Sequence, residues 1–106
     1  MAKIVWTRPA LDDVKSIFDY VAKDSPNRAE KLAIDLLEAP EKRLEKFPDS
    51  GSPIDELREF GAREIYHKSY RIIYVHRRGG CLIVACIHGS RDLLKVLDPT
   101  RWADLP

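Results

Sequence analysis

The chain has 106 residues and a mass of 12.2 kDa, which fits one domain over residues 1–106 that buries roughly 65% of its unfolded surface. Hydrophobic residues make up 44% of the chain and charged residues 33%, a globular composition that excludes disordered and collagen-like proteins. The sequence contains neither a run of about 20 apolar residues nor the pattern of a signal peptide. We therefore expect a cytoplasmic protein that does not enter a membrane.

The formal net charge of +1 hides an asymmetry along the chain. Residues 1–62 carry 10 Lys and Arg against 13 Asp and Glu, whereas residues 63–106 carry 8 against 4. All three histidines, His67, His76 and His88, lie in the basic part. This pattern suits a partner that carries negative charge, but an acidic helical surface beside a basic sheet with no binding role is the commoner meaning of such an asymmetry.

The N-terminal half predicts one short strand and two amphipathic helices. Lys3–Trp6 is rich in β-formers, and Thr7 follows it as a typical N-cap with a proline in the first turn. The first helix ends near Lys23, and Ser25-Pro26 repeats the cap signal for a second helix. Apolar residues recur at helical spacing in both helices: Leu11, Val14, Ile17, Phe18 and Val21, then Ala29, Leu32, Ala33, Leu36 and Leu37. Pro40 interrupts the second pattern, so we expect a kink or a new start there.

The C-terminal half predicts a sheet. After a turn cluster at residues 48–53, the hydrophobic period changes from 3.6 to 2, and three strands are expected: Ile65–Lys68, Tyr70–Arg77 and Cys81–His88. The last two strands are joined across Arg78–Gly80, a tight hairpin signal, so they must be antiparallel. Leu93–Leu97 is apolar enough for a short helix or strand. The predicted class is α+β in the order β-α-α-β-β-β, with a helical hairpin packed on one face of an antiparallel sheet and the other face partly open.

The two cysteines, Cys81 and Cys86, lie on the last expected strand. Their spacing of five residues places them on opposite faces of that strand, about 16 Å apart, which excludes a disulfide between them within it. Their neighbours are apolar, so we expect buried, reduced thiols that bind no zinc.

Two residues on the expected strands carry the best chemical signals. Arg71 stands among apolar neighbours, so it either binds an anion or forms a structural ion pair with a carboxylate such as Glu64, and its strand position favours the ion pair. His88 closes the last strand, where a rigid sheet often holds a general acid or base. The commoner role for such a histidine is structural, bonded to the backbone or to Asp92.

The sequence lacks a glycine-rich phosphate loop, a metal-ligand cluster, a serine nucleophile elbow and a dinucleotide fingerprint. We therefore expect no metal and no cofactor. The remaining set, Arg71, His88 and Arg91 with His67 and Tyr70 nearby, suits polyanion binding or metal-free RNA cleavage. In such a cleavage a base takes the 2′-OH proton and an arginine stabilises the phosphorane.

An ordered set of segments resembles the RelE/ParE superfamily of bacterial type II toxins. The segments cover nearly the whole chain: Trp6–Ala22, Phe47–Gly51, Glu56–Glu64, Ser69–Tyr74 and Ile87–Leu93. Each motif alone is weak, whereas their order is fairly specific, and the β-α-α-β-β-β core of that superfamily matches the order predicted above.

The resemblance implies a growth-arresting toxin that a cognate antitoxin neutralises in a toxin-antitoxin hetero-oligomer. ParE-like members inhibit DNA gyrase, whereas RelE-like members cleave mRNA on the ribosome. In an RNase, Arg71 would take the place of the arginine that contacts the scissile phosphate, and His88 and Arg91 match the region where some members carry catalytic residues. Contacts with the target or the antitoxin are expected from four further residues: Arg63, His67, Tyr70 and Trp102.

Three hypotheses follow. The first is a non-enzymatic gyrase inhibitor, which the ParE-like ending at residues 88–93 and the near-neutral charge favour, because affinity for a phosphate backbone needs many cations. The second is a ribosome-dependent mRNA endonuclease that uses Arg71, His88 and Arg91. The third is an inactive member that only binds its antitoxin.

Overall fold

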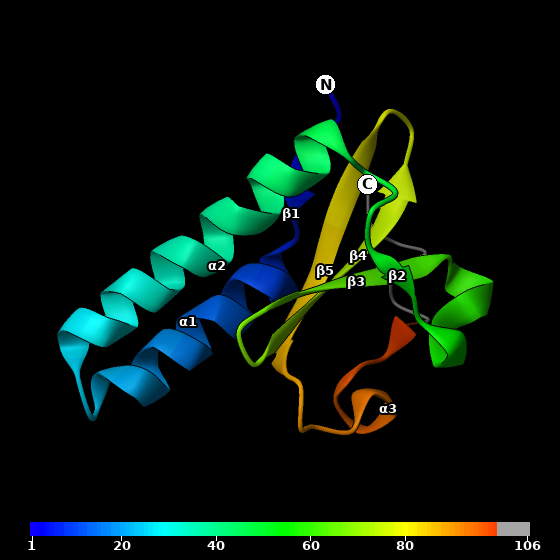
Figure 1. Ribbon diagram of the computed structural model, residues 1–106. Coiled ribbons are helices and arrows are strands. Elements are labelled where there is room, and N and C mark those ends of the chain that lie inside the picture. Colours follow the sequence, from blue (N-terminus) through cyan, green and yellow to red (C-terminus); the bar gives the residue numbers. More distant parts are fainter. Residues whose placement is uncertain (100–106) are drawn as a thin grey trace.

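A computed structural model describes residues 1–99 of the chain (Figure 1). It confirms the α+β class and the predicted order, and it adds a two-residue strand and a 3-10 helix before the last three strands. The elements are β1 (Lys3–Trp6), α1 (Arg8–Ala22), α2 (Pro26–Lys46), β2 (Ser52–Pro53), the 3-10 helix η1 (Asp55–Phe60), β3 (Ala62–His67), β4 (Tyr70–Arg77), β5 (Gly80–His88) and α3 (Leu93–Val96). No helix within residues 1–99 is long and apolar enough to cross a membrane.

The two predicted helix caps are confirmed. The hydroxyl of Thr7 accepts the N–H of Ala10 at 3.3 Å, and that of Ser25 accepts the N–H of Arg28 at the same distance. Each satisfies one N–H of a first helical turn that has no partner inside the helix. The expected new start at Pro40 is wrong, because α2 continues through this buried proline to Lys46. Burial of α2 against α1 and the sheet outweighs the lost helical hydrogen bond.

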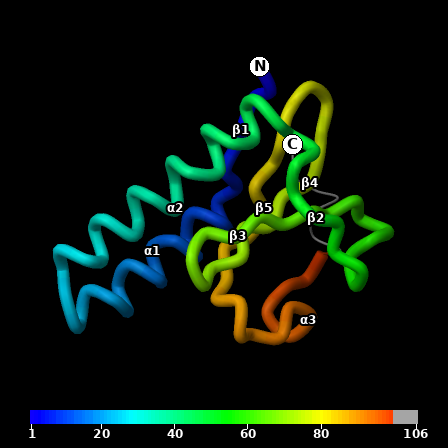
Figure 2. The backbone as a smooth tube through the Cα atoms, viewed as in Figure 1, coloured from blue at the N-terminus to red at the C-terminus, as the bar shows by residue number. Residues whose placement is uncertain are grey.

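The sheet has the strand order β1-β5-β4-β3-β2 (Figure 2). The predicted antiparallel arrangement holds from β5 to β2, whereas β1 joins the edge of β5 in parallel. Lys3 lies opposite Gly80, and a Cβ atom built on Gly80 would lie only 2.2 Å from the carbonyl oxygen of Lys3. Glycine is therefore what allows β1 to approach this closely.

Two hydrophobic clusters fill the two faces of the sheet. Under the α1–α2 hairpin lie Ala10, Val14, Leu36, Leu44, Ile65, Ile72, Tyr74, Cys81, Ile83 and Cys86. On the opposite face lie Ile54, Leu57, Ala62, Ile73, Val75, Leu82, Val84, Ala85, Ile87 and Leu93. The η1 segment and α3 cover part of this second face, so it is less open than the sequence suggested (Figure 1).

A β-bulge in β5 reverses which residues face the helices. The register with β4 passes from Tyr74 opposite Ile83 to Ile73 opposite Ala85, so Val84 is an extra residue on β5. Cys81 and Cys86 consequently lie in the same cluster under the helices, and the prediction that they face opposite sides is wrong. Both thiols are buried and free.

Candidate functional site

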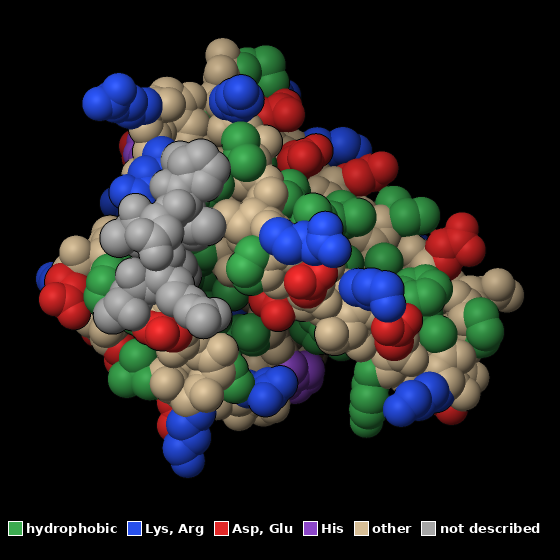
Figure 3. All heavy atoms as spheres, turned by 180° about the vertical axis from the view of Figure 1, so that it is seen from behind, with side chains coloured by type: hydrophobic (Ala, Val, Ile, Leu, Met, Phe, Trp, Pro, Cys, Tyr) green, Lys and Arg blue, Asp and Glu red, His purple; other side chains and the backbone are tan. Residues whose placement is uncertain are grey.

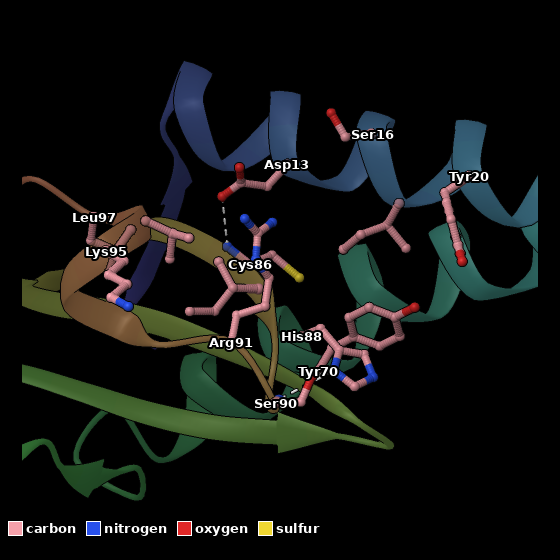
Figure 4. A pocket seen from close by; sticks show the side chains of 13 residues that line it. Asp13, Ser16, Tyr20, Tyr70, Cys86, His88, Ser90, Arg91, Lys95 and Leu97 are labelled. Carbon is pink, nitrogen blue, oxygen red and sulfur yellow. Dashed lines mark hydrogen bonds between the residues drawn. The ribbon is translucent and has the colours of Figure 1, made fainter.

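A groove of about 830 Å³ lies between α1, the ends of β4 and β5, and α3 (Figure 4). We define the groove by its lining residues: Asp13, Ser16, Ile17, Tyr20, Tyr70, Cys86, Ile87, His88, Ser90, Arg91, Lys95, Val96 and Leu97. The α1 wall comes from positions 13, 16, 17 and 20, which form one stripe of the helix. The segment after β5 and α3 supply the cationic side with Arg91 and Lys95.

His88 lies at the mouth of the groove and is exposed. Its ring meets the ring of Tyr70 edge-on, with the centroids 5.4 Å apart and the planes at 85°. Its Nδ1 lies 2.7 Å from the Ser90 hydroxyl and accepts the N–H of Ser90 at 3.2 Å. Because a backbone N–H can only donate, Nδ1 is the acceptor in the second of these contacts. The expected partner Asp92 instead caps α3 by accepting the N–H of Leu94.

Asp13 lies where β5 loses its neighbouring strand. Pairing with β1 stops at Ile83, and the Asp13 carboxylate accepts the N–H of Cys86 at 2.9 Å. Burial raises the pKa of Asp13, and the hydrogen bond from Cys86 and the charge of Arg91 offset part of this rise. Burial and the Asp13 charge raise the pKa of Cys86 to about 12. Where α1 meets β5, the groove therefore combines a half-buried carboxyl group with a neutral, unreactive thiol.

Arg71 lies on the other face of the sheet. Tyr70 is opposite His88, and Arg71 is opposite Ile87, so the side chains of Arg71 and His88 point away from each other. The Nε of Arg71 lies 2.5 Å from Oε1 of Glu64, and these side chains are only 12% and 15% exposed. Burial opposes the charge of Arg71, but the hydrogen bond and the charge of Glu64 raise its pKa overall. The structure thus confirms the predicted ion pair.

The remaining predicted contact residues are dispersed. Arg63 donates to the carbonyl oxygens of Gly51 at 2.8 Å and Asp49 at 3.3 Å, so it braces the turn before β2. His67 is half-buried, and its Nε2 has no hydrogen-bond partner within residues 1–99. Trp102 lies outside the described residues.

The structure therefore gathers Tyr70, His88 and Arg91 at one groove and leaves Arg71 outside it. Sequence reasoning missed five polar groove residues: Asp13, Ser16, Tyr20, Ser90 and Lys95. The available signal was the pair Asp13 and Ser16, which the periodicity places on the side of α1 away from its apolar stripe. Within the described part of the chain, no three His, Cys, Asp or Glu side chains form a possible metal site.

Comparison with known proteins identifies the family. A family profile described as "ParE toxin of type II toxin-antitoxin system, parDE" matches residues 4–93. The chain belongs to the ParE toxin family. This confirms the RelE/ParE resemblance that the sequence motifs indicated.

Two relatives of this ParE-family chain are informative. It is 39% identical over 51 residues to "Toxin RelE2" of Caulobacter vibrioides, an alignment that covers 48% of this chain and 57% of the relative. The chain thus spans under two thirds of that curated relative. A solved chain from "Chromosomal ParDE TA system from P. aeruginosa" superimposes with a TM-score of 0.70 at 24% identity, covering 83% of this chain and 96% of the other. This second likeness supports the fold.

Proposed function

We propose that this ParE-family chain is a toxin that arrests growth by inhibiting DNA gyrase through protein contact, without catalysing a reaction, and that a cognate antitoxin neutralises it. The observation that carries the choice of a non-enzymatic toxin is the separation of Arg71 from His88 on opposite faces of the sheet.

Metal-free RNA cleavage needs a base at the 2′-OH and a cation at the same phosphate. Arg71 is bound to Glu64 and points away from the groove, so it is poorly placed to be that cation. The Nδ1 of His88 is already engaged by the hydroxyl and the N–H of Ser90. Both features favour contact with a protein over catalysis.

The exposed groove residues are the proposed contacts in this function. His88 and Arg91 are exposed, and Tyr70 lies beside His88, so these three side chains can meet a protein partner directly. The groove mixes apolar side chains with polar and charged ones, as protein–protein interfaces do. Arg63, bound to the turn carbonyls, and the half-buried His67 are proposed to take a smaller part.

Pulse labelling of bacteria in the first minutes after induction of this chain alone tests the proposal. We expect thymidine incorporation to fall before methionine incorporation, and the purified chain to inhibit supercoiling of relaxed plasmid by purified gyrase. His88→Ala should change gyrase inhibition only by the loss of one contact. Under the endonuclease alternative, the same change would slow mRNA cleavage by about 10²–10⁴-fold.

Two results would overturn the proposal. If methionine incorporation falls first and new mRNA ends appear, the chain is a ribosome-dependent endonuclease. If cells grow normally without an antitoxin while the chain accumulates in folded form, the chain is a binding module.

A further inference from the structure

Five exposed cations gather at the end of the molecule opposite the groove. They come from three separate segments, and we call them the basic tip: Lys3, Lys42, Lys46, Arg77 and Arg78. Backbone hydrogen bonds hold the segments together, because the N–H of Ala2 donates to the carbonyl of Glu45 and that of Lys3 to Gly79. The N-terminus, the end of α2 and the β4–β5 turn accordingly lie side by side in Figures 1 and 2.

The carboxylates on and beside these segments do not cancel the positive charge of the basic tip. Glu41 and Glu45 are half-buried, and Asp49 already lies 3.1 Å from Nδ1 of His76. Lys and Arg side chains protrude at this end in the space-filling view (Figure 3). The tip therefore presents net positive charge to a partner, because its five cations outnumber these three carboxylates.

The sheet also sets the spacing of the cations. Lys3 and Arg77 lie opposite Gly80 on its two sides, so their Cα atoms are about 10 Å apart, two strand spacings. Gly79 and Gly80 carry no side chain, so the surface between Lys3 and Arg77 is formed by backbone, and the cationic side chains stand on either side of it. A surface of this kind fits an extended polyanion, whose charges repeat along its length.

We propose that the basic tip binds the sugar-phosphate backbone of duplex DNA without reading its sequence. The choice of DNA among polyanions rests on the proposed function, since gyrase acts on DNA and an inhibitor bound to gyrase lies beside it. The tip and the groove are at opposite ends of β5, about 27 Å apart by strand length, so a protein in the groove leaves the tip accessible to DNA.

Fluorescence anisotropy of a labelled 20-base-pair duplex at several salt concentrations tests the inference. We expect the full chain to bind with a logarithmic salt slope of about −0.9 for each phosphate contacted. The variant Arg78→Gln/Lys46→Gln should bind about 10-fold more weakly at low salt, with the slope reduced by about 1.8. The matched control Lys23→Gln/Lys31→Gln removes the same charge near the far end of the helical hairpin and should retain wild-type binding.

Equal losses in both variants would overturn the inference, because net charge alone would then explain binding. Binding to phosphatidylglycerol vesicles but not to the duplex would also overturn it in favour of a membrane surface. Circular dichroism of each variant verifies that it is folded. Gyrase inhibition without DNA binding would refute only the proposal that the basic tip binds DNA. DNA binding without gyrase inhibition would refute only the proposed function.

Discussion

Removing the carboxylate of Glu64 should destabilise the protein strongly. Glu64→Ala leaves the guanidinium of Arg71 largely buried without its partner, and breaking a buried ion pair costs about 3–5 kcal/mol. Since the two side chains keep 12% and 15% exposure, we expect the lower end, about 3 kcal/mol. For a domain of this size, that loss lowers Tm by roughly 12 °C or more.

The double variant Arg71→Met/Glu64→Leu separates the net contribution of the ion pair to stability from the cost of leaving a buried charge unpaired. It replaces both ions by apolar side chains beside Ile73 and Ile87, so it should recover most of the stability that the single variant loses. Urea unfolding followed by circular dichroism gives the free energies. An exposed control is Asp12→Ala, which breaks the Arg8–Asp12 pair and should cost under about 1 kcal/mol.

The reasoning is refuted if Glu64→Ala costs no more than Asp12→Ala, or if the double variant is as unstable as the single one. The same double variant also bears on function. If Arg71 is structural, a folded Arg71→Met/Glu64→Leu chain keeps its toxicity in cells. If Arg71 contacts a scissile phosphate, the chain stays folded but loses toxicity.

Three further changes test the fold and the groove. Tyr74→Phe removes two hydrogen bonds to the turn at residues 48–51 and should lower the free energy of unfolding by about 1–3 kcal/mol. Urea titrations measure this value, and an unchanged value would contradict the role of the hydroxyl. Gly80→Ala places a methyl group against the carbonyl of Lys3 and should cost about 3 kcal/mol and speed hydrogen exchange in β1; unaltered exchange would contradict this. Burial raises the pKa of Asp13 above 3.8, so the folded state binds its proton more tightly than the unfolded state does. The wild-type protein should therefore gain stability relative to Asp13→Asn as the pH falls from 7 to 4. A stability difference that does not change with pH would refute this prediction.

The helical half of the fold was predictable because its signals are local. Thr7 and Ser25 each stand directly before a helix with a proline in its first turn, and each satisfies an N–H of that turn. The hydrophobic stripes of the two helices repeat within a few residues, so a short window of sequence contains them. The continuation of α2 through Pro40 was not local, since it depends on contacts with α1 and the sheet.

The parts that sequence reasoning missed depend on distant pairing. The parallel contact of β1 with β5 joins residues that lie almost eighty positions apart, and no local pattern encodes it. The hydrogen bond from Cys86 to Asp13 arises only because β1 ends before that N–H. The helical periodicity alone places Asp13 away from the apolar stripe of α1, whereas the fold makes it part of the groove.

The separation of Arg71 from His88 follows from one extra residue in β5. If the register that sets Arg77 opposite Gly80 continued unbroken, Arg71 would lie opposite Cys86 and on the same face of the sheet. His88, two residues after Cys86, would then lie on the face of Arg71 as well. The bulge at Val84 shifts the pairing by one, so Arg71 lies opposite Ile87 and His88 opposite Tyr70. Regular alternation thus predicts a shared site for Arg71 and His88. The bulge instead directs Arg71 to Glu64 and His88 to the groove, and this separation is the basis of the proposed contact with a protein.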